Sequence, residues 1–223
     1  FKDVFAIQSE VAQSIAEALK AQLSPNEKQL IEKRATQNLD AYAYFLQGRD
    51  CYYHLTKDDN ERAIGLFKKA VSLDPTYALA FAGLADTYAQ RYQRYGSGRE
   101  WIDSSMMLSQ HAIQLDPELP EAYKSLGLAY YQKEWYEKAL EQHRKALKLN
   151  PNFASAYSNM GELLDWTGHQ DEAVALIKKA IQLQPGRASD YIKLGSVYSS
   201  LGLDSLAQLH LTKGIEQQPS VTT

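Results

Sequence analysis

The spacing of four prolines constrains the fold of this chain more than any other feature. Pro117, Pro151, Pro185 and Pro219 each follow the one before by 34 residues, so three blocks of equal length stand in tandem. Proline ends a helix, because it lacks a backbone N–H and its ring clashes with the preceding turn. A constant period of this size is typical of a solenoid, in which each block is stabilised by packing on its neighbours.

Each block carries two apolar stripes with helical spacing. In the block after Pro117 the first stripe consists of Tyr123, Leu126, Gly127 and Tyr130, and the second consists of Ala139, His143 and Ala146. The next two blocks repeat both stripes with Tyr157, Met160, Gly161, Leu164, Ala173, Ile177 and Ala180, and then with Tyr191, Leu194, Gly195, Tyr198, Ala207, Leu211 and Gly214. Two helices per block follow, with a break at 133–135, and we expect these residues to pack the helices together.

This pattern resembles the tetratricopeptide repeat (TPR), whose large, Leu, Gly, Tyr, Ala and Pro positions the stripes match one by one. The resemblance implies an all-α fold, a right-handed TPR superhelix of about five helix–turn–helix repeats. We expect residues 1–38 to be leading helices and residues 39–223 to be the array. The predicted repeats cover about residues 41–77, 78–119, 120–153, 154–187 and 188–221.

The first two repeats depart from the 34-residue period. Three extra residues in the first repeat are expected to lengthen the turn near 56–60. The second repeat has an insertion at 91–101, which we predict to be a lengthened helical hairpin with solvated charges. A docking loop is the alternative, formed by Arg91, Arg94, Arg99 and Trp101.

Two leading helices are expected before the repeats. The first is amphipathic, with its apolar stripe formed by Val4, Ile7, Val11, Ile15 and Leu19. The second begins at Ser24-Pro25-Asn26-Glu27, where Ser caps the helix and Glu completes a capping box, and it runs to about Arg34. Because the first residue is Phe1, we expect the chain to be a piece of a longer protein. The last helix, about 205–217, is expected to leave an apolar edge uncovered.

A second resemblance concerns about residues 1–119. Segments 3–12, 23–25, 44–49 and 77–88 resemble the hinge region of bacterial multidomain regulators. In those proteins a nucleotide cyclase, a Ser/Thr kinase or a winged-helix domain precedes a TolB-like domain and a TPR array. By this resemblance the first helix would close the TolB-like domain.

The concave groove is the predicted binding site, because solenoids commonly bind partners on that surface. The first helix of each repeat lines it in a TPR array, and the residues one step round from the packed stripe face it. The predicted groove residues are Asp86, Lys124, Leu128, Tyr131, Asn159, Glu162, Asp165, Trp166 and Lys193. Apolar and aromatic groups beside carboxylates suit a peptide with basic and apolar side chains. A solvated groove without a ligand is the alternative.

A carboxylate clamp like that of TPR co-chaperones is a further alternative. Lys124, Asn159 and Lys193 occupy three of its positions, but Leu128 and Ser189 stand where an asparagine and a lysine belong. Carboxylates at 162 and 165 would also repel a ligand carboxylate. We therefore do not expect this chain to bind a chaperone tail.

Composition and motifs argue against a catalytic activity for this chain. The net charge of −3 gives no reason to expect nucleic acid or a membrane surface as partner. The one cysteine, Cys51, excludes an internal disulfide and is expected to be buried. The five histidines have no metal-ligand spacing, and no phosphate-binding or nucleophile motif is present. We expect no catalytic residue, metal or cofactor.

The sequence thus predicts a non-catalytic protein-binding module, the scaffolding or sensory tail of a bacterial signalling or transcription regulator. One alternative is that it regulates a larger enzyme, a cyclase or kinase. Another is self-association through the terminal helices. The expected compartment is the cytoplasm.

Overall fold

The structure is a computed structural model that describes residues 35–96 and 98–217, together with positions 7, 10, 11, 14, 15, 17 and 18. Ten α-helices run between Leu39 and Glu216, and the described residues contain no β-strand. The helices are α3 (Leu39–His54), α4 (Lys57–Leu73), α5 (Ala78–Tyr95), α6 (Glu100–Leu115), α7 (Pro120–Gln132), α8 (Tyr136–Leu149), α9 (Ala154–Trp166), α10 (Gln170–Leu183), α11 (Ala188–Ser200) and α12 (Asp204–Glu216).

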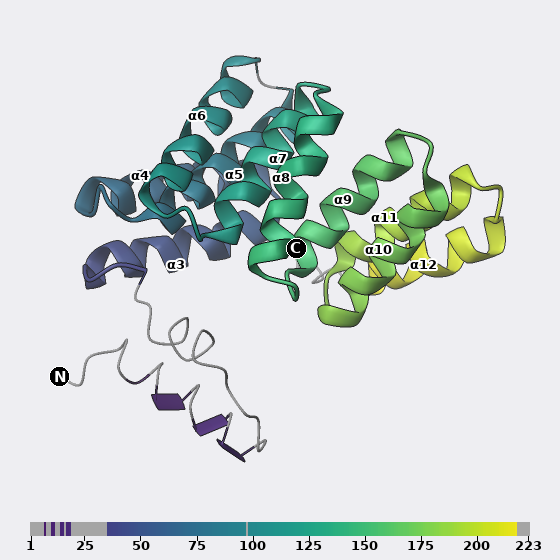
Figure 1. The fold of residues 1–223 in the computed structure, drawn as a ribbon, viewed down its shortest axis with the longest axis horizontal. Helices are drawn as coiled ribbons and strands as arrows, with labels where there is room; N and C mark the ends of the chain where they lie inside the picture. The colour runs from purple at the N-terminus through teal and green to yellow at the C-terminus, as the bar shows by residue number, and fades with distance from the viewer. Residues whose placement is uncertain are drawn as a thin grey trace.

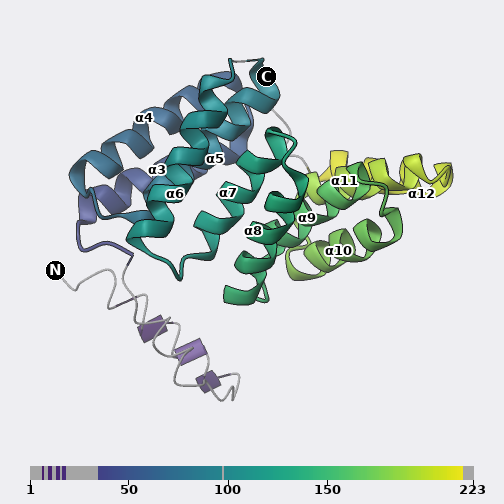
Figure 2. The same cartoon turned by 45° about the horizontal axis from the view of Figure 1, so that its top comes forward.

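The helices form five antiparallel pairs, which we number repeat 1 (α3–α4) to repeat 5 (α11–α12). Successive pairs lie side by side and follow one another along the long axis of the molecule (Figures 1 and 2). Each helix packs on its pair partner, and both helices of repeats 1 to 4 also pack on the pair that follows in the chain. The fold is therefore an α-solenoid, as the 34-residue period predicts.

Local sequence explains the turns between repeats. After α4, α6 and α8 the C-cap residues Asp74, Asp116 and Asn150 each accept a hydrogen bond from the backbone N–H two residues on, at 2.9, 3.1 and 3.0 Å. This is the Asx-turn that Asp and Asn form readily. The proline that follows each cap cannot continue the helix, so the chain turns at the same point of each repeat.

The turns inside repeats 3 to 5 also recur. Glu134, Gly168 and Gly202 stand one period apart, and all three have positive φ, at 62°, 84° and 71°. The next residue donates its backbone N–H to a carbonyl in the preceding helix, for example Trp135 to Tyr130 at 2.9 Å. Glycine adopts this left-handed conformation without strain, whereas in repeat 3 Glu134 adopts it within the break predicted at 133–135.

Close contacts between the two helices of a repeat require a small residue in the first helix. A Cβ on Gly161 would lie 2.6 Å from Cγ1 of Ile177, and one on Gly127 would lie 2.7 Å from the His143 ring. In repeat 2 the equivalent residue is Ala85, and the residue facing it is the small Ser105, which donates to the Ala85 carbonyl at 2.8 Å. The side chains of the two helices therefore compensate each other in size.

The extra residues of repeat 1 are not in the turn. Leu55 and Thr56 alone separate α3 from α4, so the predicted lengthening near 56–60 is wrong and the additional residues extend the helices. Thr56 caps α4 by accepting the Asp59 N–H at 3.0 Å, which starts the helix early. In repeat 2 the predicted hairpin is confirmed, because α5 continues to Tyr95 and α6 begins at Glu100.

Apolar side chains are exposed toward both ends of the array. Ile7, Val11 and Ile15 are helical and are 40%, 52% and 54% exposed. The other residues of the predicted first helix, and the second leading helix, lie outside the described residues. On α12 the predicted apolar edge is present, and its exposed side chains are Leu206, Leu209, Leu211 and Ile215. Self-association through these surfaces stays a prediction.

Candidate binding groove

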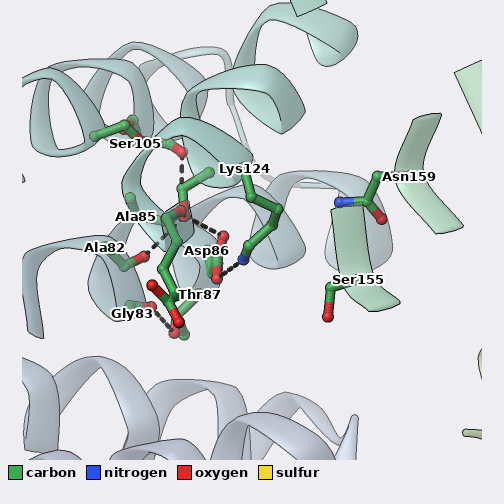
Figure 3. A network of polar contacts seen from close by, with 12 residues as sticks. Ala82, Gly83, Ala85, Asp86, Thr87, Ser105, Lys124, Ser155 and Asn159 are labelled. Atoms are coloured by element: carbon green, nitrogen blue, oxygen red, sulfur yellow. Dashed lines mark hydrogen bonds and ion pairs between the residues drawn. The ribbon is translucent and has the colours of Figure 1, made fainter. Parts of the chain in front are cut away.

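Polar side chains join the first helices of neighbouring repeats at two junctions, and we call this set of contacts the polar ladder. Between repeats 2 and 3, Lys124 on α7 forms an ion pair with Asp86 on α5, and Ser125 Oγ donates to Asp86 Oδ1 at 2.7 Å. Figure 3 shows Lys124 turned toward Asp86, with Asn159 and Ser155 on α9 facing them. Both members of the ion pair are buried. The pair therefore crosslinks α5 to α7 and leaves neither charge free.

Repeats 4 and 5 are crosslinked in the same way. Lys193 on α11 reaches Glu162 on α9 at 2.6 Å and donates to Asn159 Oδ1 at 3.2 Å. Ser158 Oγ donates to Asp190 Oδ1 at 2.6 Å, and both residues are fully buried. Further polar contacts across this junction join Arg187 to Ser155 and Ser200 to Asp165.

The ladder is interrupted between repeats 3 and 4. Leu128 stands one period before Glu162, and Asn159 stands one period before Lys193, so a leucine and an amide replace the ion pair. Among the described residues, which include all of α7 to α10, no ion pair joins the helices of these two repeats.

This interruption leaves an apolar and aromatic surface, which we call the central groove: Leu128, Tyr131, Asn159 and Trp166. Trp166 is 70% exposed, an unusual state for so large an apolar side chain. Leu128, Tyr131 and Asn159 are partly buried. Burial raises the pKa of the Tyr131 hydroxyl, and the Glu162 carboxylate raises it further. Tyr131 thus stays a neutral hydrogen-bonding group.

The structure distributes the predicted groove residues over three environments. Asp86 and Lys124 form a buried pair, Glu162 and Lys193 form a second pair, and Asp165 accepts from Ser200 at 3.1 Å. The remaining four form the central groove. The clamp alternative relies on Lys124, Asn159 and Lys193. Both of its lysines are already paired with carboxylates, so an incoming ligand carboxylate would have to displace Asp86 and Glu162.

Two of the predicted docking-loop residues are part of a packed stack. The Arg91 guanidinium lies 4.7 Å from the Trp101 ring and 3.2 Å from a Glu61 carboxylate oxygen. Trp101 in turn packs edge-on against Tyr88 at 4.9 Å. Arg94 and Arg99 are exposed. Tyr95 donates its hydroxyl to the Leu55 carbonyl at 2.8 Å, which ties the hairpin to repeat 1.

Several residues of the groove were missed by sequence reasoning. Arg187 and Asp190 crosslink repeat 5 to Ser155 and Ser158 of repeat 4, and Tyr52 and Glu121 line the inner side of the array. Asp190 carries a signal in the sequence, since alanine occupies the equivalent position of the two preceding repeats, at Ala122 and Ala156. Tyr52 and Glu121 carry none, because only the curvature of the array brings α3 near α7 and α9.

Part of the chain matches two descriptions of one repeat family. Residues 127–164 match "TPR repeat", and residues 154–187 match "Tetratricopeptide repeat". The curated protein "Putative adenylate cyclase 3" of Rhizobium meliloti (strain 1021) is 28% identical over 130 residues, which are 57% of this chain and 22% of that protein. The chain thus spans about a fifth of the length of this relative.

Solved TPR structures share the fold. TTC0263, a thermophilic TPR protein of Thermus thermophilus, has a TM-score of 0.67 at 22% identity, covering 81% of this chain and 93% of that one. MamA has a TM-score of 0.50 at 27% identity, covering 73% of this chain and 90% of that one. The chain therefore contains tetratricopeptide repeats and has the fold of a TPR superhelix. Arrays of this class present concave surfaces for interaction with other proteins.

Membrane-spanning helices and metal-ligand clusters are both absent from the described residues. No helix among them is both long and apolar enough to cross a membrane. In the same residues, no group of three or more His, Cys, Asp or Glu side chains is arranged to hold a metal ion. Cys51 is 5% exposed, as expected for a small packed side chain.

Proposed function

We propose that this chain is a non-catalytic module that binds an extended peptide or protein segment in its concave groove, across the junction of repeats 3 and 4. The observation that carries this proposal is the interruption of the polar ladder. On either side of the junction the groove charges neutralise each other, whereas Leu128, Tyr131, Asn159 and Trp166 have free surface. An exposed tryptophan beside a tyrosine is the composition of a binding hot spot.

The chemistry of the central groove suits a peptide in two respects. Tyr131, Trp166 and Leu128 offer apolar area for a side chain of the ligand. Asn159 uses its carbonyl oxygen to accept from Lys193, and its NH2 group has no hydrogen-bond partner among the described residues, so it can donate to a peptide carbonyl. Side-chain pockets together with backbone hydrogen bonds are the usual basis of extended-peptide recognition.

The test compares the double variant Tyr131→Ala/Trp166→Ala with Trp135→Ala. Trp135 is 41% exposed and lies in the turn between α7 and α8, so it controls for the loss of a surface tryptophan. Peptides selected on the whole chain from a random display library would be measured by fluorescence anisotropy. We expect at least tenfold weaker binding to the double variant and no change for Trp135→Ala, since hot-spot truncations cost about 2 kcal/mol or more. Equal binding to both variants would place the site elsewhere.

We further propose that the module acts within a longer bacterial regulator, such as a cyclase. The match to "Putative adenylate cyclase 3" over 130 residues supports this. The test is to sequence the coding region upstream of Phe1. A cyclase, kinase or winged-helix domain in the same reading frame is the expected result, and a stop codon directly before Phe1 is the result that contradicts it.

A further inference from the structure

A cavity opens on the concave side, where the C-terminal end of α3 approaches the start of α9. It measures about 170 Å³, and we call it the inner pocket. Its walls come from α3, α4, α5, α7 and the first residues of repeat 4. Lys124 and Ser155 line the inner pocket, and each stands one helical turn before a residue of the central groove, Leu128 and Asn159. Figure 3 shows Lys124, Ser155 and Asn159 near one another, so a segment bound along the groove could place one side chain in the pocket.

Aromatic rings form much of the inner pocket. Phe45, Tyr52 and Tyr53 line it from α3, and Phe153 lines it from the turn before α9. Tyr52 and Tyr53 pack edge to face, with their ring centroids 5.3 Å apart. Ring faces attract a cation and also pack against an aliphatic chain.

The charges in the inner pocket leave one carboxylate without a counter-ion. Asp86 and Lys124 neutralise each other. Glu121 forms no ion pair among the described residues, although it lines the inner pocket beside Lys124. Glu121 is partly buried in the pocket wall, and this burial raises the pKa of its carboxyl.

The cations around the pocket do not satisfy Glu121. Arg49 is exposed and lies over the Phe45 ring at 5.8 Å, so it faces solvent at the rim. Lys124 is held by Asp86, and Arg187 lies near Asp190 at 3.6 Å. A desolvated carboxylate without a partner is unfavourable, and a cation from a ligand would remove that penalty.

We propose that the inner pocket takes a lysine or arginine side chain of the bound segment. The ammonium or guanidinium group binds the Glu121 carboxylate, and the aliphatic stem packs against Tyr52, Tyr53 and Phe153. An acidic side chain would meet Glu121 and Asp86, and an apolar one would leave Glu121 desolvated and unpaired. This assignment rests on the proposed groove function and adds to it the charge of the ligand.

The experiment uses acetylated peptide amides with the sequence Ala-Ala-X-Ala-Leu-Ala-Ala, where X is Arg, Lys, norleucine or Glu. Binding to the whole chain is measured by NMR titration into the millimolar range. The variant Glu121→Gln keeps the size of the side chain and removes its charge. Its matched control is Glu118→Gln, because Glu118 is exposed in the turn before α7.

We expect the Arg and Lys peptides to bind at least tenfold more tightly than the norleucine and Glu peptides. We also expect Glu121→Gln, but not Glu118→Gln, to abolish this preference, since charge-assisted hydrogen bonds account for at least that factor. Equal binding of the Arg and norleucine peptides, or no binding of either, overturns the assignment. The proposed groove function is tested separately by the Tyr131→Ala/Trp166→Ala variant with selected peptides, so the two proposals can fail independently.

Discussion

The junction between repeats 4 and 5 and the junction between repeats 3 and 4 are built from the same helix positions but differ in their chemistry. The first is crosslinked by Glu162–Lys193 and by the buried Ser158–Asp190 hydrogen bond. At the second, Leu128 and Asn159 occupy the positions of Glu162 and Lys193. One repeat geometry can therefore either lock two neighbours together or leave their shared groove open for a ligand.

The two large clusters of buried apolar side chains lie on opposite sides of the junction between repeats 3 and 4. Leu164, Ile177, Leu194 and Val197 of repeats 4 and 5 form one buried cluster, to which Leu140 on α8 adds the contact from repeat 3. A separate cluster around Phe45, Phe67 and Tyr77 joins repeats 1 and 2. Because each repeat in a solenoid is stabilised through its neighbours, we expect the junction of repeats 3 and 4 to be where the array unfolds in parts.

At neutral pH the largest expected effect comes from breaking the crosslinked junction. Asp190→Ala removes a fully buried carboxylate that accepts from Ser158 at 2.6 Å. We expect it to lower the free energy of unfolding by about 3 kcal/mol, since losing one member of a buried polar pair leaves the other unsatisfied. Urea unfolding followed by circular dichroism measures this. Asp165→Ala is the control, because its bond to Ser200 is exposed and its loss should change stability by about 0.5 kcal/mol or less.

The second prediction tests whether the open junction separates the array into two parts. Gly161→Leu places a side chain where a Cβ already lies 2.6 Å from Ile177 and 3.1 Å from the Ala173 carbonyl oxygen. We expect a loss of about 1 to 3 kcal/mol from overpacking. Hydrogen exchange should show lost protection in α9–α12 while α3–α8 keep theirs.

Gly65→Leu provides the control for this substitution. A Cβ on Gly65, which is exposed on α4, meets no atom within 4 Å. Its stability should stay the same or rise slightly, because glycine is unfavourable inside a helix. Uniform loss of protection across all ten helices of the Gly161→Leu variant would show that the two parts unfold together.

The third prediction concerns the stability of the fold in acid, through His143 in repeat 3. Burial, with smaller contributions from Lys124 and Lys193, lowers the pKa of His143 to about 3 from 6.5. Below pH 6.5 the unfolded chain takes up a proton that the folded chain does not bind. Stability is therefore full above pH 6.5 and falls toward pH 3, by up to about 1.4 kcal/mol per pH unit.

His143→Leu should remove this acid dependence. Leucine is the residue at the equivalent position of repeat 5, where Leu211 faces Gly195. It would also replace the buried Nδ1 of His143, which has no hydrogen-bond partner. Thermal melts of both proteins between pH 4 and pH 8 measure the difference. Parallel curves would show that His143 does not control acid stability.

The smallest expected effect comes from converting one junction into the other. The double variant Leu128→Glu/Asn159→Lys places the Glu162–Lys193 pair at the equivalent positions of the open junction. We expect stability to change by about 0.5 kcal/mol or less, because the gain from a partly exposed ion pair is offset by the loss of the Lys193–Asn159 hydrogen bond and by two lysines lying close together. We also expect weaker binding of groove peptides. Either single substitution is the control, because it adds a charge without its partner. Unchanged peptide binding would show that the interrupted ladder is not the binding site.

The sequence alone determined the architecture of this protein. Helix-breaking prolines, the Asp and Asn caps and the glycines of the turns act over a few residues, so a 34-residue period predicts five helix pairs and their boundaries. The prediction for the turn of repeat 1 was wrong, also for a reason that acts over a few residues. The three extra residues of repeat 1 extend its helices, because the Thr56 cap can start α4 immediately after α3.

The tertiary structure decided which groove residues are available to a ligand. The sequence predicts four free charges in the groove, on Asp86, Lys124, Glu162 and Lys193. In the fold these charges neutralise each other across repeat boundaries. The inner pocket depends on curvature, since Tyr52 and Phe153 lie about a hundred residues apart and meet only when the pairs are stacked. Helix periodicity determines which side of a helix a residue occupies, whereas pairing and curvature depend on distances between helices that a repeat pattern does not encode.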